Sequence, residues 1–146
     1  MRVLIVDDQS SIRALIKAVL RSMDINDIDE AGNGAQALAK LRDGKAFQLM
    51  ITDWYMPELS GIDLLREVRA DADLHALRVI MLTSEHDRDH ILAVTALQVH
   101  GYVVKPFKPE TLIKSVQSAL RAAPAKLIAK PPPAEVAPAE VPPPKD

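Results

Sequence analysis

The stretch Val3-Leu4-Ile5-Val6-Asp7-Asp8 decides the fold, because four branched apolar residues end abruptly in two carboxylates. Residues 49–53, 79–83 and 102–106 repeat this pattern of an apolar run followed by a polar residue. Continuous apolar runs are typical of parallel strands that helices cover on both faces. If each run is such a strand, every polar residue falls at or just past the C-terminal end of its strand.

The segments between these runs carry apolar residues at helical spacing. The helix markers are Ile12 to Met23 with Ser10 or Ser11 as N-cap, Ala37, Leu38 and Leu41 after the Asn33-Gly34 turn, Ile62, Leu65 and Val68 after Gly61, residues 87–99, and residues 109–121 with Pro109 first. A weaker strand near residues 28–31 has interleaved polar residues, which favours the edge of a sheet. Five strand–helix units predict an α/β fold: a doubly wound, five-stranded parallel sheet with helices on both faces.

Composition places the chain among ordinary globular proteins. It has 146 residues, of which 48% are hydrophobic and 26% charged, with a net charge of −2. This charge gives no electrostatic basis for binding nucleic acid or an anionic membrane. Cysteine is absent, the first apolar run is too short for a signal peptide, and nothing approaches the ~20 apolar residues of a membrane span. We therefore expect a cytoplasmic protein.

The composition changes sharply near Ala122. Residues 123–146 contain eight of the eleven prolines and no aromatic residue. Proline fixes φ and removes a hydrogen-bond donor, so this stretch predicts an extended, disordered tail or linker instead of a helix or sheet. A Pro-rich segment that binds a partner is the alternative. The expected division is a folded domain at residues 1–122 and a tail at 123–146.

The carboxyl ends of parallel strands form the edge where open α/β sheets bind ligands. The residues brought to this edge are Asp7, Asp8, Asp53, Thr83 and Lys105. Neighbouring carboxylates repel each other by ~1 to 4 kcal/mol at high effective dielectric, and a divalent cation removes that penalty. Mg²⁺ suits an oxygen-only site. A carboxylate at the mouth of a central strand can attack phosphorus, so Asp53 is the predicted phosphoacceptor.

Several motifs together resemble the receiver domain of bacterial two-component response regulators, of the single-domain, CheY-like type. They are residues 6–8, residues 52–57, Gly61, Thr83-Ser84 and residues 101–107. The resemblance covers roughly residues 2–120 and implies a flavodoxin-like strand order. It also implies that a histidine kinase or phosphotransfer protein donates a phosphoryl group from phosphohistidine to Asp53, with Mg²⁺ as cofactor.

The resemblance assigns the metal ligands. Asp8 and Asp53 would bind Mg²⁺ directly, Asp7 through water, and Tyr55 through its backbone carbonyl. Trp54 would cover the rim of the site.

The resemblance also assigns the groups that hold the phosphoryl oxygens, which are the Thr83 hydroxyl and the Lys105 ammonium. The bond between Lys105 and Pro106 would be cis, aiming the ammonium inward. Tyr102 has two interpretations: half-buried packing, or an aromatic switch that turns inward when Thr83 moves. The last two helices and the strand between them would then form the surface read by a target protein, with candidate residues Leu92, Val99, Ile113 and Lys114.

Two residues depart from the family pattern. Tyr55 stands where relatives often carry a smaller polar residue, and with Glu85 it would flank the path of hydrolytic water, which predicts slow dephosphorylation. Gln98 stands where relatives usually place glycine in a left-handed helix cap. The pair His86 and His90 has metal-binding spacing but no third ligand nearby, so a solvated face is expected.

A phosphorylatable switch without catalytic output is the expected function, and there are three alternatives. One is a pseudo-receiver that binds partners regardless of phosphorylation. Another is a haloacid-dehalogenase-type phosphatase, which needs aspartates two apart where Asp7 and Asp8 are adjacent. The third is a receiver cut from a longer regulator whose effector follows the Pro-rich segment. We expect a monomer, with dimerisation possible through the surface of the last two helices, and no direct nucleic-acid or membrane partner.

Overall fold

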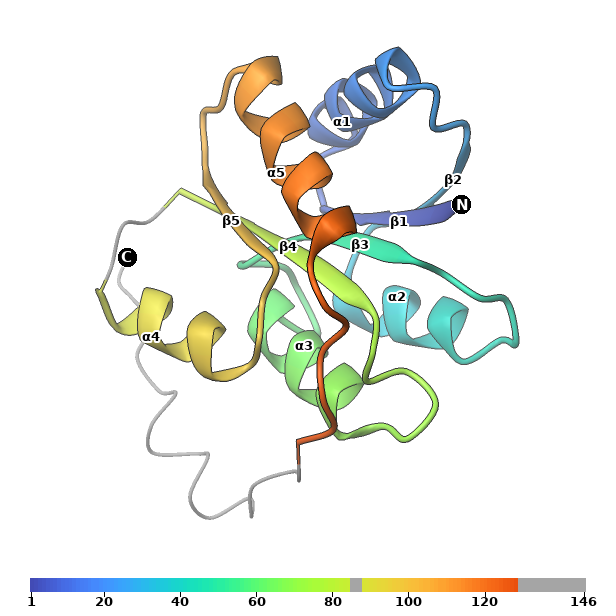
Figure 1. Cartoon of the computed structure of the whole chain (residues 1–146), viewed down its shortest axis with the longest axis vertical. Coiled ribbons are helices and arrows are strands. Elements are labelled where there is room, and N and C mark those ends of the chain that lie inside the picture. Colours follow the sequence, from blue (N-terminus) through green and yellow to red (C-terminus); the bar gives the residue numbers. More distant parts are fainter. Residues whose placement is uncertain (85–87, 129–146) are drawn as a thin grey trace.

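Strands and helices alternate from Arg2 to Arg121 in the computed structural model, which describes residues 1–84 and 88–128 (Figure 1). The strands are β1 (Arg2–Val6), β2 (Asp27–Ala31), β3 (Leu49–Asp53), β4 (Arg78–Thr83) and β5 (Gly101–Val104). The helices are α1 (Ser10–Ser22), α2 (Gly34–Leu41), α3 (Gly61–Ala70), α4 (Arg88–Ala96) and α5 (Pro109–Arg121). The predicted succession of strand–helix units is confirmed.

The five strands form one parallel sheet in the order β2-β1-β3-β4-β5. This is the doubly wound, flavodoxin-like order, in which the winding reverses between β1 and β3. The polar strand β2 lies at an edge, as predicted. The register aligns Val6 with Thr52 and Thr83 with Val104, so the carboxyl ends of four strands come together.

Helices cover both faces of the sheet, which explains the continuous apolar strands (Figure 1). Alternate strand residues point to opposite faces. Val3, Ile5 and Ile51 belong to the core under α1 and α5, whereas Leu4 and Met50 belong to the core under α2, α3 and α4. Within the described residues, no helix has the length and apolarity needed to cross a lipid bilayer.

The helix starts follow from short-range chemistry. Asn33 and Ser60 cap α2 and α3 by accepting hydrogen bonds from the N–H groups of Gln36 and Asp63, and Pro109 opens α5 as predicted. The prediction of Ser10 or Ser11 as the N-cap of α1 was wrong, because the helix begins at Ser10 and Gln9 precedes it without a side-chain cap.

Helix α4 ends earlier than predicted, at Ala96, in a turn of the Schellman type. The N–H of Gln98 donates to the carbonyl of Thr95 (3.0 Å) and that of Val99 to Val94 (3.1 Å). Gln98 has φ 57°, so it does occupy the left-handed position where glycine is usual, at a cost of ~1 kcal/mol. The predictions for Glu85 and His86, and the predicted start of this helix at residue 87, fall outside the described residues.

Beyond α5 the chain runs back along the domain. Residues 123–128 have no regular secondary structure, and Ala125 is buried against the domain. The N–H of Ile128 donates to the carbonyl of Arg69 at 2.8 Å. The predicted tail therefore begins with a docked segment, and its remainder, residues 129–146, lies outside the described residues.

Gly61 fixes the loop that carries β3 into α3. Its N–H donates to the carbonyl of Trp54 at 2.7 Å, and a Cβ at this position would overlap the carbonyl oxygen of Asp53. Glycine is required here because the first turn of α3 approaches the end of β3 directly.

Replacing Gly61 with alanine should therefore destabilise the fold by about 2–4 kcal/mol, because the backbone of Asp53 must move. Urea unfolding measures this loss. Gly32→Ala is the matched control, since a Cβ there meets only the flexible Gln36 side chain at 3.7 Å. Equal stabilities of the two variants would contradict the steric argument.

Candidate functional site

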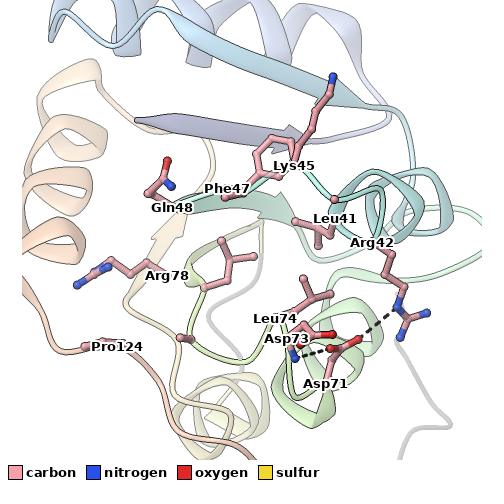
Figure 2. Close-up of a pocket in the computed structure, with 14 residues that line it drawn as sticks. Leu41, Arg42, Lys45, Phe47, Gln48, Asp71, Asp73, Leu74, Arg78 and Pro124 are labelled. Atoms are coloured by element: carbon pink, nitrogen blue, oxygen red, sulfur yellow. Dashed lines mark hydrogen bonds and ion pairs between the residues drawn. The ribbon is translucent and has the colours of Figure 1, made fainter.

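A pocket of about 590 Å³ lies at the edge of the sheet where β3 and β4 begin (Figure 2). Phe47, Leu74 and Leu77 contribute its apolar wall. Arg42 and Asp71 at its rim pair with each other at 3.4 Å. Among the described residues, its lining includes none of the predicted site residues. The candidate site lies at the other end of the strands, where β1, β3, β4 and β5 reach their carboxyl ends.

Three carboxylates gather at the carboxyl ends of β1 and β3. One oxygen from each of Asp7, Asp8 and Asp53 lies within 4.8 Å of the others. Asp7 is fully buried, Asp53 is 9% exposed, and Asp8 is exposed to solvent. The structure thus brings together the acidic residues that the strand pattern places at this edge.

Lys105 completes the cluster from the end of β5. Its ammonium lies 2.9 Å from Oδ2 of Asp7 and 3.3 Å from Oδ1 of Asp53. The backbone N–H of Lys105 donates to the carbonyl of Thr83 at 2.7 Å, and the bond to Pro106 is cis, in line with the expectation. A single ammonium faces three carboxylates here, so the described cluster keeps an excess of negative charge.

The pKa of the Asp53 carboxyl is raised mainly by burial. Burial is the largest effect and raises the pKa, the charge of Lys105 lowers it, and the charge of Asp7 raises it, so that the net pKa is about 6. Burial by itself would lower the pKa of Lys105, but the hydrogen bond that its ammonium donates to Asp7 and the charges of both carboxylates outweigh burial and raise the pKa. The site therefore favours additional positive charge.

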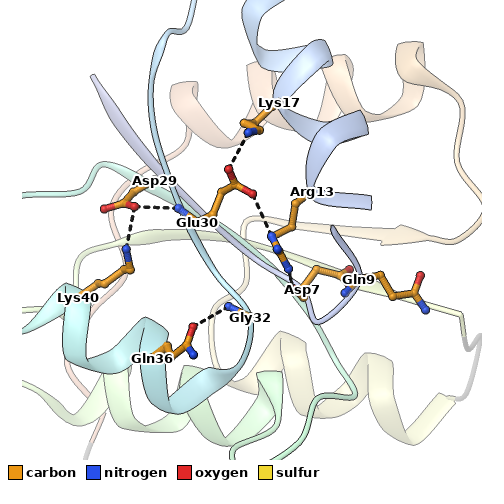
Figure 3. A network of polar contacts seen from close by, with 9 residues as sticks. All are labelled: Asp7, Gln9, Arg13, Lys17, Asp29, Glu30, Gly32, Gln36 and Lys40. Atoms are coloured by element: carbon orange, nitrogen blue, oxygen red, sulfur yellow. Dashed lines mark hydrogen bonds and ion pairs between the residues drawn. The ribbon is translucent and has the colours of Figure 1, made fainter. Parts of the chain in front are cut away.

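A network on α1 and β2 supports the Asp7 turn (Figure 3). The guanidinium of Arg13 donates to the backbone carbonyl of Asp7 at 2.6 Å and to Glu30 at 2.9 Å. Lys17 lies 2.6 Å from Glu30, and this hydrogen bond together with that of Arg13 lowers the pKa of Glu30. Sequence reasoning missed this network, although Arg13 and Lys17 stand four apart on one helix face, opposite the polar edge strand.

Asp7 itself closes the turn into α1. Its Oδ1 accepts a hydrogen bond from the N–H of Gln9 at 2.9 Å, while Oδ2 accepts from Lys105. This side chain replaces the predicted serine cap, because its carboxylate already orders the backbone between β1 and the helix. Asp7 is thus fixed at both oxygens.

The other predicted residues surround this cluster at different depths. Thr83 is fully buried at the end of β4, and Tyr102 is half-buried against the core under α2, α3 and α4. Tyr55 is 39% exposed in the loop after β3. The expectation that Trp54 covers the rim was wrong, because Trp54 is only 7% exposed and belongs to that same core.

The four candidate surface residues divide into two groups. Leu92 on α4 is 61% exposed, and Lys114 on α5 is also exposed. Val99 and Ile113 are partly buried and pack against the two cores. Of the four candidates, therefore, Leu92 and Lys114 lie on the exposed surface of the last two helices.

The donor set suits a small, hard cation. All three side chains offer carboxylate oxygens, which is the ligand type that Mg²⁺ prefers, and its octahedron spans roughly 4 Å between opposite ligands. The 4.8 Å limit on the carboxylate oxygens is close to that span, so small side-chain rotations would bring all three oxygens to one ion. Asp7, Asp8 and Asp53 fit a magnesium ion.

Comparisons with known proteins agree with this geometry. The family model described as response regulator receiver domain matches residues 3–117. The chain is 45% identical over 117 residues to chemotaxis protein CheY of Pseudomonas aeruginosa, covering 80% of this chain and 94% of that relative. It is 45% identical over 112 residues to chemotaxis protein CheY-3 of Vibrio cholerae, covering 77% and 85%. The crystallised CheY4 of Vibrio cholerae superposes with a TM-score of 0.74 at 34% identity, covering 82% of this chain and 98% of that one.

The raised pKa of Asp53 makes a prediction about stability. A carboxyl group whose folded pKa lies near 6, above its ordinary 3.8, stabilises the fold at low pH and loses that contribution as pH rises through this window. Asp53→Asn should therefore stabilise the metal-free protein at pH 7.5, by about 1–3 kcal/mol. The gain should shrink towards zero near pH 4.

Urea unfolding in the presence of a chelator, repeated from pH 4 to 8, measures this gain. Asp43→Asn, at an exposed position in the loop after α2, is the control and should change little. A destabilised Asp53→Asn variant at pH 7.5 would contradict the electrostatic description of the site.

Proposed function

This chain belongs to the family of response regulator receiver domains, and we propose that it acts as a phosphorylatable signalling switch. A histidine kinase or phosphotransfer protein would supply the phosphoryl group, and Asp53 would accept it. The observation that carries the proposal is the contact of Lys105 with both Asp7 and Asp53, beside the exposed Asp8. This arrangement combines a nucleophilic oxygen, a charge for the phosphoryl oxygens and an oxygen-rich metal site.

In the reaction, a carboxylate oxygen of Asp53 attacks phosphorus as the P–N bond to the donor histidine breaks, and the imidazole keeps the electron pair. Asp53 must be ionised for this attack, and at neutral pH a carboxyl group with a pKa of about 6 is mostly ionised. Mg²⁺, held by Asp8 and Asp53 directly, by Asp7 through water and by the Tyr55 carbonyl, would neutralise charge on the phosphoryl oxygens. The hydrogen bond from the Gln9 N–H would keep the Asp7 carboxylate oriented when Lys105 turns to the phosphoryl group.

The phosphoryl group then competes for the existing partners of the site. Lys105 is already paired with Asp53, so its ammonium can move to a phosphoryl oxygen within the same cluster. The Thr83 hydroxyl would donate to another oxygen, and its displacement would let Tyr102 turn inward. Such a switch works by population shift, since phosphorylation favours one of two existing arrangements.

The output would be a change of the surface formed by α4, β5 and α5, where a target protein binds. Exposed Leu92 and Lys114 lie on this surface. We propose no enzymatic output beyond assisted phosphotransfer and slow self-dephosphorylation, and a cytoplasmic location, as for a signalling partner of a kinase.

Incubating the protein with acetyl phosphate and Mg²⁺ should add one phosphoryl group, seen by intact mass spectrometry. Asp53→Asn should abolish the adduct, because the amide lacks the nucleophilic oxygen, whereas the exposed control Asp43→Asn should keep it. A chelator should also abolish it. An adduct that survives in Asp53→Asn would overturn the assignment, and no adduct in the wild-type protein would favour the phosphorylation-independent alternative.

Tyr55 should slow the loss of the phosphoryl group, because its ring excludes attacking water better than an amide does. Tyr55→Asn should release phosphate several-fold faster than wild type, while Tyr55→Phe, which keeps the ring, should stay near the wild-type rate. The measurement is phosphate release from the purified phosphoprotein in Mg²⁺ buffer. An Asn variant that is equally slow would show that the ring does not control water access.

A further inference from the structure

The segment that follows α5 is docked on the domain by a series of backbone contacts. We call residues 123–128 the C-terminal strap. The carbonyl of Ala123 lies 2.9 Å from Nε2 of His100, and both the N–H and the carbonyl of Lys126 bond to the side-chain amide of Gln98, at 2.9 and 3.1 Å. Ala125 between them is 6% exposed. These contacts hold an extended peptide in one register.

Gln98 both ends α4 in the left-handed conformation and binds the C-terminal strap through its side chain. Its amide pairs with one backbone donor and one backbone acceptor of Lys126, as a neighbouring strand would. Glycine would adopt φ 57° without strain but has no side chain to make this clamp. The strained residue is therefore explained by the strap that it binds.

His100 ties the strap to the sheet in the same way. The N–H of Val79 donates to Nδ1 at 3.2 Å, which assigns the remaining ring proton to Nε2, the donor to Ala123. Burial lowers the pKa of this imidazole, and the charges of Arg69 and Arg78 lower it further. The neutral ring thus links the start of β4 to the strap.

Arg69 connects the loop between α4 and β5 to helix α3. Its fully buried guanidinium donates to the carbonyls of Leu97 (2.9 Å) and Gln98 (3.0 Å), and its own carbonyl accepts from the N–H of Ile128 (2.8 Å). The loop between α4 and β5 and the strap therefore share one support. A shift of this loop cannot leave the strap contacts unchanged.

The loop between α4 and β5 in turn belongs to the surface formed by α4, β5 and α5, which contains the predicted switch residue Tyr102. Val94, Leu97, Val99 and Tyr102 contribute to the same core, and Tyr102 follows the loop directly in β5. A rotation of Tyr102 that repacks these side chains would move the Gln98 carbonyl and amide together. Coupling then passes through packed side chains and hydrogen bonds over four residues.

We propose that the C-terminal strap is docked while Lys105 pairs with Asp7 and Asp53, and is released when Asp53 is phosphorylated. This inference rests on the proposed function. Release would free residues 123–128 from the domain in the active state alone. By reciprocity, docking of the strap must oppose phosphorylation.

Amide hydrogen exchange on the full chain tests the proposal, with and without Mg²⁺ and fluoroberyllate, a mimic of the phosphoryl group. The amides of Lys126 and Ile128 should exchange roughly ten-fold faster with the mimic bound. Fluorine NMR reports binding of the mimic independently. Bound mimic with unchanged strap exchange overturns this inference alone, whereas absence of binding overturns the proposed function and the inference with it.

The variant Gln98→Asn tests the clamp. Asparagine tolerates the left-handed conformation and keeps the amide, but its side chain is one methylene too short to reach Lys126. Strap amides should then exchange fast in both states, and fluoroberyllate should bind several-fold more tightly. Gln117→Asn, at an exposed position on α5, should match wild type. Unchanged strap exchange or unchanged affinity for the mimic in Gln98→Asn would overturn the coupling.

Discussion

The pairing of one ammonium with two buried carboxylates is the interaction on which this molecule depends. Lys105 lies within 3.3 Å of both Asp7 and Asp53, and without it the fold would enclose uncompensated negative charge. One ammonium leaves the cluster only partly neutralised, and burial raises the pKa of Asp53 to about 6 even though the charge of Lys105 lowers it. A site left short of positive charge is suited to recruit a cation and then to respond to an incoming phosphoryl group.

The scaffold holds this charge in place through its backbone. Parallel register brings the ends of β1, β3, β4 and β5 to one edge, and Gly61 allows α3 to start against the carbonyl of Asp53. Arg13 and Glu30 fix the turn after β1 from the opposite side. The loop between α4 and β5 bears Gln98. The surface formed by α4, β5 and α5 is therefore connected both to the acidic cluster and to the C-terminal strap.

Much of this was predictable because the signals are local or periodic. Buried parallel strands read as unbroken apolar runs, and helices read as apolar residues three and four apart, so the order of elements and the edge position of β2 could be predicted. The convergence of Asp7, Asp53 and Lys105 followed from topology alone. Three features could not be predicted: the cap of α1, the last residue of α4 and the position of Trp54. Each depends on partners distant in the sequence or on the depth of a side chain.

The sequence by itself determined the fold class and the residues at the carboxyl edge of the sheet, since pattern and residue type are sufficient for these, whereas the left-handed position at Gln98 was expected from the family resemblance. Tertiary structure alone decided that Asp7 is held at both oxygens, that Arg13 supports the turn, and that residues 123–128 dock on the domain. The physical reason is that hydrogen bonds and ion pairs between distant segments depend on distances of a few tenths of an ångström, which no periodicity encodes.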